Sequence, residues 1–463
     1  MRWISVSGDR LVDQGGATVV LTGFGLGGWL NMENFITGYP ATETLQREAL
    51  RRALGPEGYQ AFFDEFDQVF FSDHDARYIA SLGCNSVRLP FNYRRLEDDR
   101  APFVIKPEGL AALDRAVEIC KRAGLHVILD LHAAPGCQNQ SWHSDNPTHW
   151  DAFWDHVHFQ DRVVHLWRVL ADRYQDEPAV AGYNLLNEPA DRTGARLSPF
   201  YDRLSAAVRQ IDPRHVLFLD GNTYSTDFSM FDRPIDNAVY TAHDYARPGM
   251  LPRSAYPGET EGKYFDRDKL EQVFLERTQF QRRTGTPIWV GEFGPQYTGD
   301  PARDAERVQM LRDQLDIYAA AGASWSLWTY KDVGLQGIRV VPPESSYLRQ
   351  IAGVLVAKAR LGTDQWGGDD SGVRCLIDPI MEVFAREFPD FDPYPWGVDR
   401  WVGVLVRSIL LAEPLVSQFE AAFRGLSPAE AKDRAACFAF DKTVETTALA
   451  QVLRVALGVP ETS

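Results

Sequence analysis

Eight short apolar runs recur between residues 19 and 328, and longer amphipathic segments separate most of them. Apolar runs of this length are typical of strands that are buried on both faces, as in parallel sheets. The predicted strands are VVLTGF (19–24), CNSVRLP (84–90), HVILDLH (126–132), AGYNLLN (181–187), HVLFLD (215–220), AVYTAH (238–243), PIWVGE (287–292) and ASWSLW (323–328).

Helices fit between most of these strands. Apolar residues recur at helical spacing over residues 107–124, 160–174 and 198–212. Eight strands that alternate with helices predict an α/β protein with a (β/α)8 barrel, the TIM barrel. The rival fold is an open, doubly wound sheet. That fold normally has a glycine-rich phosphate loop after its first strand, and GFGLGG at 23–28 has the wrong spacing for one.

The barrel pattern has additions at both ends. Residues 3–18 predict a small hairpin that closes the barrel floor, with DQGG as its turn. Three loops, at 25–75, 133–159 and 330–372, are long, and long loops at the carboxyl rim of a barrel tend to be functional. Three helical patterns follow from about residue 374, at DPIMEVFAREF, WVGVLVRSILL and SPAEAKDRAACFAF.

A barrel needs only about 250 residues, so the tail is an addition to it. No proline- or serine-rich linker precedes the tail, and we therefore expect it to pack on the barrel. The predicted organisation is a catalytic barrel with an N-terminal hairpin over 1–340, then a rim loop and helical C-terminal extension over 341–463. An oligomer could form through this extension.

The charge balance is acidic, with 64 acidic against 48 basic residues and a net charge of −16. This argues against nucleic acid or an anionic membrane surface as partner. We find no secretory signal and no apolar stretch of 18 residues; the best candidate, 401–412, is short and interrupted by Arg407. Five scattered cysteines fit reduced thiols, and we expect a cytoplasmic protein.

Chemically useful residues stand at the ends of the predicted strands. Side chains at the carboxyl ends of barrel strands converge on one volume, so these residues should meet. Two carboxylates in such a position are what retaining glycoside hydrolysis requires, one as acid/base and one as nucleophile. The strand-end residues are Arg88, His132, Asn187, Glu188, His243, Glu292 and Trp328.

The two glutamates need opposite protonation states. Glu292 must stay ionised to attack the anomeric carbon, and Arg88 can favour its anion. Tyr245 could donate a hydrogen bond to Glu292. Glu188 must carry a proton for the leaving oxygen, and burial beside a negative charge would keep it protonated. For retention, the two carboxyls should lie roughly 5 Å apart.

Other strand-end residues suit contacts with a sugar. Asn187 can bond the 2-hydroxyl, an interaction that strengthens in the transition state. His132 and His243 can bond sugar hydroxyls or orient the glutamates. Trp328 can stack on the apolar face of a sugar ring.

Two loops carry weaker signals. Cys137, His143 and His149 lie in one loop, but their spacing matches no zinc pattern, so we predict no metal and no cofactor. The same loop more plausibly lines the sugar site with residues such as Trp142. Lys331 and Asp332 follow Trp328 and could bind hydroxyls of the terminal sugar; the alternative is a solvated loop pair.

Several of these segments together resemble glycoside hydrolase family five, the cellulase-like family of retaining enzymes with a (β/α)8 barrel. The resemblance covers residues 1 to about 340. It implies Glu188 as acid/base and Glu292 as nucleophile, with Arg88, His132, Asn187, His243, Tyr245 and Trp328 in the surrounding subsite. The segments are S-V-R-L-P-F (86–91), D-L-H (130–132), N-E-P (187–189), H-D-Y (243–245), G-E-F-G (291–294) and W-S-L-W (325–328).

The expected function is that of a retaining β-glycosidase that hydrolyses short β-linked oligosaccharides. Long rim loops and a docked tail can close one end of a cleft, which favours exo-action on a terminal sugar. The KDVGLQG run and the tail resemble those of family members that act on short β-mannosides, with β-glucosides as the next choice. The alternatives are an endo-β-1,4-glucanase and a noncatalytic glycan-binding barrel, although a binding module would need neither glutamate.

Overall fold

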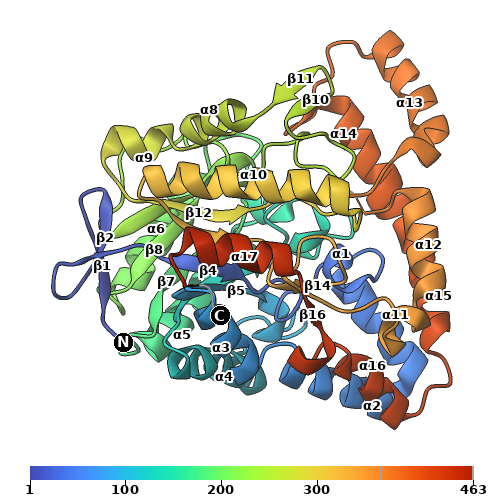
Figure 1. Ribbon diagram of the computed structural model, residues 1–463, viewed down its shortest axis with the longest axis horizontal. Coiled ribbons are helices and arrows are strands. Elements are labelled where there is room, and N and C mark those ends of the chain that lie inside the picture. Colours follow the sequence, from blue (N-terminus) through green and yellow to red (C-terminus); the bar gives the residue numbers. More distant parts are fainter. Residues whose placement is uncertain (365, 461–463) are drawn as a thin grey trace.

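Eight parallel strands close into a barrel at the centre of the computed structural model, which describes residues 1–364 and 366–460 (Figure 1). The strands follow one another around the barrel in sequence order, and the last pairs with the first. The predicted (β/α)8 barrel is therefore confirmed. Its strands are β4 (Thr22–Gly25), β5 (Ser86–Asn92), β6 (His126–Ala133), β7 (Val180–Asn184), β8 (Val216–Asp220), β9 (Ala238–His243), β12 (Ile288–Phe293) and β13 (Ser324–Leu327).

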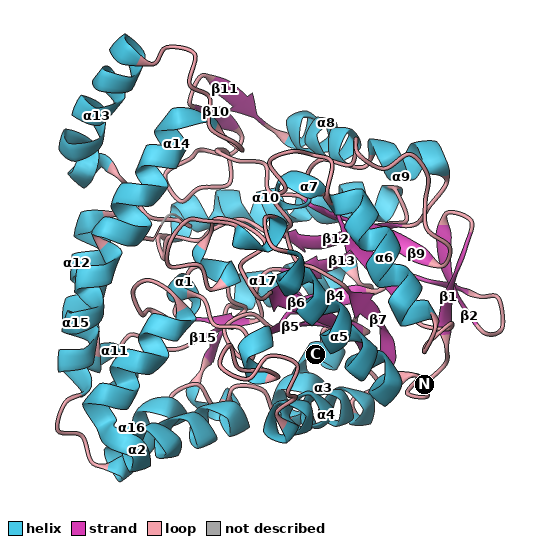
Figure 2. Cartoon of the chain, turned by 180° about the vertical axis from the view of Figure 1, so that it is seen from behind, coloured by secondary structure: helices cyan, strands magenta, loops and turns pink. Residues whose placement is uncertain are grey.

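Helices surround the strands on the outside of the barrel (Figure 2). The long loop after β4 contains two of these outer helices. The first of the two, over Glu43–Val69, is divided by Gly55, which has a φ of 66° and lies just before Pro56. The helices of the barrel are α2 (Glu43–Val69), α3 (Asp73–Ser81), α4 (Pro107–Arg122), α5 (Val157–Tyr174), α6 (Leu197–Arg209), α8 (Arg267–Arg277), α9 (Gln279–Thr284) and α10 (Pro301–Ala320). Short helices α1 (Asn34–Thr37) and α7 (Asn222–Ser225) and the hairpin β10 (Gly258–Thr260) and β11 (Lys263–Phe265) lie in rim loops.

A small N-terminal sheet closes the barrel floor, as expected. Strands β1 (Ile4–Ser7), β2 (Arg10–Asp13) and β3 (Thr18–Val19) pair antiparallel in that order. Ile4 and Leu11 of this sheet join an apolar cluster with Trp289 and other strand residues of the barrel. The predicted turn was wrong, because Ser7 pairs with Arg10 and the hairpin turns at Gly8 and Asp9. DQGG instead joins β2 to β3.

The residues after β13 form helices that pack on the barrel. Helices α15 and α16 lie against α2, and α17 lies beside α10, as Figure 1 shows in red and yellow. Four of these helices, α11, α12, α15 and α17, were not predicted, and α11 and α12 lie within the expected loop 330–372. The helices are α11 (Ser346–Gln350), α12 (Ala352–Leu361), α13 (Arg374–Glu387), α14 (Gly397–Val404), α15 (Ala412–Phe423), α16 (Pro428–Ala436) and α17 (Thr447–Ala456).

A small sheet joins the extension to the rim of the barrel. It pairs β14 (Lys331–Asp332) with β15 (Arg339–Val340), and β15 with β16 (Val444–Glu445) near the end of the chain. Strand β16 therefore continues a sheet that begins in the rim loop. The division of the chain near residue 340 stays a prediction.

One apolar helical run is longer than the sequence analysis indicated. Helices α14 and α15 are continuous through a π-helical turn, Leu405–Leu410, and the run Gly397–Phe423 reaches a mean hydropathy of 1.4 over its most apolar window. Length and composition alone would let it cross a membrane, which corrects the expectation that no such stretch exists. Half of that window is buried inside the protein, and Arg407 donates to the carbonyl oxygens of Gly362 and Gly368.

Lys331 and Asp332 do not face the sugar site, and the prediction that they bind hydroxyls is corrected. The Lys331 side chain is fully buried, and its Nζ lies 2.8 Å from Asp75 Oδ1, 2.6 Å from the carbonyl oxygen of Phe70 and 2.8 Å from that of Phe438. Asp332 accepts hydrogen bonds from the backbone N–H groups of residues 334, 335 and 336. Lys331 therefore fixes the rim loop against the extension, and Asp332 fixes the turn of the loop itself.

The substitution Lys331→Met tests this structural role. It leaves Asp75 buried without its cation, so we expect the free energy of unfolding to fall by about 3 to 5 kcal/mol. The double variant Lys331→Met, Asp75→Asn removes both charges and should recover part of that loss. Urea unfolding measures stability, and KM should stay unchanged in the folded fraction. A raised KM without loss of stability would restore the sugar-binding role.

Candidate active site

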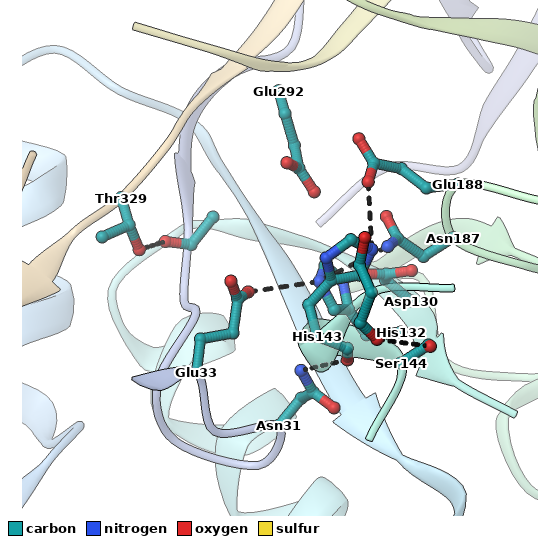
Figure 3. Close-up of polar contacts among 12 residues, drawn as sticks. Asn31, Glu33, Asp130, His132, His143, Ser144, Asn187, Glu188, Glu292 and Thr329 are labelled. Carbon is teal, nitrogen blue, oxygen red and sulfur yellow. Dashed lines mark hydrogen bonds and ion pairs between the residues drawn. The ribbon is translucent and has the colours of Figure 1, made fainter. Parts of the chain in front are cut away.

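Glu188 and Glu292 approach each other at the carboxyl rim of the barrel (Figure 3). Glu292 lies in β12, and Glu188 follows the end of β7 by four residues. One carboxylate oxygen of Glu188 lies within 4.8 Å of one of Glu292, and both side chains are buried. This separation is the one expected for retention and is too short to hold the attacking water of an inverting enzyme.

Strand β7 ends at Asn184, earlier than the predicted end at residue 187. The chain bends through the next residues, and Glu188 has a φ of 44°, in the left-handed region that non-glycine residues rarely occupy. Its backbone N–H donates to Asp220 Oδ2 at 2.9 Å, which fixes this unusual conformation. Strained backbone of this kind is concentrated at functional sites.

Two donors hold the Glu292 carboxylate. Arg88 Nη1 donates to Oε1 at 2.6 Å, and the Tyr245 hydroxyl donates to Oε2 at 3.1 Å. Arg88 is fully buried on β5, and its Nη2 also donates to Asn187 Oδ1 at 2.6 Å. The predicted partners of Glu292 are therefore both in place.

Two histidines contact Glu188. His243 Nδ1 lies 2.6 Å from Oε1, and His143 Nε2 lies 3.1 Å from Oε2. Burial lowers the pKa of His243 to about 4, so this histidine is neutral near pH 7 and acts on Glu188 through a hydrogen bond. His143 belongs to the loop after β6 that the sequence analysis considered for metal binding.

The pKa shifts of the two glutamates reverse the expected order. Burial and the charge of Glu188 raise the pKa of Glu292 to about 8, although the charge of Arg88 opposes this. Burial also opposes ionisation of Glu188, but hydrogen bonds from His143 and His243 hold its pKa well below its usual range. Because the two carboxyls interact strongly, these values belong to the pair, which carries one shared proton near neutral pH.

His132 and Asn187 lie at the floor of the site. His132 Nδ1 lies 2.7 Å from Asp130 Oδ2, and its ring stacks on Trp328 with ring centres 5.3 Å apart. Burial opposes the charged form, but Asp130 raises the pKa of His132 to about 10, so the ring is a cation at neutral pH. Asn187 Nδ2 lies 3.4 Å from His132 Nε2.

A cavity of about 660 Å³ opens above the catalytic pair. The predicted residues Trp142 and Trp328 line it together with His132, His243 and Tyr245. Arg88 instead donates to Glu292, and Asn187 accepts a hydrogen bond from Arg88. The C-terminal extension supplies much of the opposite wall. Its contributions are Trp366, Asp370, Trp396, Asp399, Arg400, Gly403 and Arg407.

Sequence reasoning missed two residues close to the pair, Glu33 and Tyr224, and gave no contact with Glu188 to a third, His143. Glu33, in the loop after β4, is buried, and its Oε1 lies 3.4 Å from His132 Nε2 without a hydrogen-bond partner among the described residues. Tyr224 enters the cavity from a left-handed turn after β8, with a φ of 58°. His143 completes the contacts of Glu188. All three lie in loops, where the strand-end argument gives no signal.

The loop cysteine and histidines do not form a metal cluster within the described residues. His143 contacts Glu188, His149 Nδ1 lies 3.1 Å from the carbonyl oxygen of Gln140, and Cys137 lies in a turn with a φ of 61°. Glu188, His243 and Glu292 could offer three atoms to a cation. Two of these residues are the glutamates predicted to act as acid/base and nucleophile, and Arg88 already neutralises part of their charge.

Comparisons with known proteins identify the family of the chain. A family model described as Cellulase (glycosyl hydrolase family 5) matches residues 61–334. The chain is 44% identical to a protein named beta-xylosidase from Phanerodontia chrysosporium, over 98% of both chains. It is 26% identical to Endoglucanase C of Acetivibrio thermocellus, over 60% of this chain and 89% of the relative.

The same fold occurs in a crystal structure of an endogalactoceramidase, with a TM-score of 0.53 and 20% identity over 72% of this chain and 75% of that one. At this identity the likeness concerns the fold alone. The family model covers more than half of the chain, and the beta-xylosidase matches nearly all of it. The chain therefore belongs to glycosyl hydrolase family 5, a family of retaining glycoside hydrolases.

Proposed function

We propose that this glycoside hydrolase releases single sugars from the non-reducing end of short β-linked glycosides. The observation that carries the proposal is the wall that Trp366, Trp396 and Arg400 add to the cavity of the catalytic pair. A wall on one side of the pair leaves room for a terminal sugar, whereas an endo-acting enzyme needs a groove that is open at both ends. Membership of a family of glycoside hydrolases also argues against the alternative of a noncatalytic glycan-binding barrel.

Glu33 supports terminal recognition. Its buried carboxylate lines the cavity and has an unsatisfied oxygen beside His132. A carboxylate that accepts two hydroxyl groups fixes the end of a sugar ring, and a chain that continued past those hydroxyls would collide with it. Loss of a buried acceptor for such hydroxyls is costly, so Glu33 favours a terminal over an internal sugar.

The identity of the sugar is the finer part of the proposal. The full-length relative is named a beta-xylosidase, which supports a terminal β-xyloside as the first substrate to test. The rim-loop segment KDVGLQG supported a β-mannoside at the level of sequence, with a β-glucoside next. Lys331 and Asp332 of that segment bond to other protein groups and do not face the sugar site, which weakens the argument for a β-mannoside.

In the first chemical step, a Glu292 oxygen attacks the anomeric carbon and the bond to the leaving oxygen breaks. The shared proton must then be on Glu188, which gives it to the leaving oxygen. The permanent charge of Arg88, 2.6 Å from Glu292, favours this distribution when substrate separates the two carboxyls. The product of the step is a glycosyl ester of Glu292.

In the second step, Glu188 takes a proton from water as the water oxygen attacks the anomeric carbon. The ester bond breaks, and Glu292 leaves as the carboxylate that Arg88 and Tyr245 stabilise. Glu188 is then protonated again for the next cycle. The contacts with His143 and His243 hold its carboxyl in position through both steps.

The roles can be separated by leaving group. Glu292→Gln removes the nucleophile, and we expect turnover to fall about a millionfold or below detection on every substrate. Glu188→Gln should lose much less on aryl glycosides with good leaving groups, which need little protonation, than on unactivated oligosaccharides. Steady-state rates on both substrate types measure this. Equal losses for the two variants on both types would contradict the assignment.

The pH profile should report the shared proton. The pair loses it as the pH rises through about 8, so kcat/KM of the wild type should fall on the alkaline side near that value. Removing the charge of residue 188 removes a cause of the raised pKa of Glu292. The alkaline limb should therefore be absent in Glu188→Gln, assayed on an aryl glycoside with a good leaving group. The same limb in both proteins would assign it to another group.

Two assays test terminal specificity. Aryl β-xyloside, β-mannoside and β-glucoside rank the sugars, with soluble cellulose as the endo-glucanase control. A β-linked oligomer of the preferred sugar should then release monosaccharide from the first turnover, shortening by one unit at a time. Trp396→Ala, which opens the wall, should raise KM with little change in stability. Early release of mixed di- and trisaccharides would favour the endo-β-1,4-glucanase instead.

A further inference from the structure

Two arginines of the cavity wall remain unused by the chemistry described above. Arg247 follows β9, and Arg400 belongs to α14 of the C-terminal extension. Each guanidinium lies over a tryptophan of the wall: Arg247 Cζ is 5.1 Å from the ring centre of Trp366, and Arg400 Cζ is 4.3 Å from that of Trp396. Both side chains line the cavity of the catalytic pair.

Neither arginine has an anionic partner among the described residues. Arg247 Nη1 and Arg400 Nε are buried and donate no hydrogen bond to residues 1–364 and 366–460. Burial and the nearby charges of Arg400 and Arg407 lower the pKa of Arg247, and burial lowers that of Arg400. Two like charges in a partly desolvated cavity are costly unless an anion joins them.

The acidic residues of the same wall are bound by other cations. Glu261 Oε1 lies 3.0 Å from Arg253, and Asp399 Oδ1 lies 3.0 Å from Arg374. Asp370 lies 3.6 Å from Arg374 and 3.8 Å from Arg407. The chain therefore supplies carboxylates to its neighbouring arginines but not to Arg247 or Arg400.

We propose that Arg247 and Arg400 form an anion-binding subsite that recognises a carboxylate or phosphate group on the leaving-group part of the substrate. Guanidinium groups bind both of these anions through paired N–H donors, and their stacking on tryptophan fixes the donors in position. This inference rests on the proposed function, because it concerns the aglycone of the same hydrolytic reaction.

The position of Arg400 assigns the subsite to the leaving group. The Tyr224 ring lies 6.0 Å from that of His143, which contacts Glu188, the acid that protonates the leaving oxygen. Tyr224 in turn packs against Trp396 with ring centres 4.4 Å apart, so this side of the cavity is one continuous surface. The sugar that is cleaved lies at the floor, beside Trp328 and Glu33, and the aglycone leaves past Arg400.

The test uses two matched substrates, the 4-carboxyphenyl and 4-carbamoylphenyl β-glycosides of the preferred sugar. They differ in charge at the far end of the aglycone. We expect the wild type to prefer the acid by about tenfold or more in kcat/KM, the size that a charge-assisted hydrogen bond gives. Sodium chloride should reduce that preference, and inorganic phosphate should inhibit hydrolysis of the amide competitively.

The variants Arg400→Gln and Arg247→Gln should each lose the preference while keeping most of the activity on the amide. Arg400→Lys should retain part of it, and Arg253→Gln is the matched control, because Arg253 already pairs with Glu261 and should leave the preference unchanged. Equal activity of the wild type on the two substrates, without phosphate inhibition, would overturn the proposal whether or not the variants fold. Equal losses on both substrates would overturn it too, since the arginines would then bind neutral sugar. Failure of the wild type on all neutral aryl glycosides would instead reject the proposed function.

Discussion

The catalytic centre depends on one buried positive charge, that of Arg88. A guanidinium stays protonated in a protein, so the interior must surround it with oxygen acceptors or lose stability. The barrel supplies these acceptors from three other strands. Glu292 lies on β12, Asp130 on β6 and Asn184 at the end of β7, and Asn187 follows β7. The planar group has its donors in fixed directions, so the nucleophile and its neighbours are oriented before any substrate arrives.

The extension depends on cations in the same way, but as a structural device. Arg339 donates to the carbonyl oxygen of Phe440, and Lys358 donates to those of Asn34 and Tyr39. Together with Lys331, these side chains join the rim loop, the loop after β4 and the last helices into one body. The helix α14 is fixed through the π-helical turn that follows it, where Arg407 donates to the carbonyl oxygens of Gly362 and Gly368, and the shape of the cavity is a property of the whole chain.

The sequence predicted what short-range pattern determines. Period and composition identify the strands, and strand ends identify Glu188, Glu292 and Arg88 because closure of a barrel brings those ends together. The same argument failed at Lys331 and Asp332: the chain continues after Trp328 into β14, where Lys331 bonds to the extension and Asp332 bonds within its own loop. Glu33, Tyr224 and Arg400 reach the cavity from loops and a distant helix, and no local pattern marks such contacts. The predicted order of the two glutamate pKa values was also wrong. A hydrogen bond from His143 lowers the pKa of Glu188, and His143 lies in a loop, where no local pattern indicates this contact.

The charged residues of the cavity are divided between its floor, which carries carboxylates, and its wall, which carries arginines. Glu33, Glu188 and Glu292 line the floor, where the proposed mechanism makes the anomeric carbon positive in the transition state, and the carboxylates that are ionised in that step stabilise it. Arg247 and Arg400 line the wall of the same cavity, where the proposed anion of the aglycone would bind. The negative charges of the floor thus act on the reacting carbon, and the positive charges of the wall act on an anionic aglycone. This arrangement is preorganised, since the barrel fixes the floor and the extension fixes the wall, and charges held in a partly buried cavity act more strongly than the same charges in solution. The extension is thus part of the electrostatics of the site, and removing it would change the chemistry as well as the shape of the cavity.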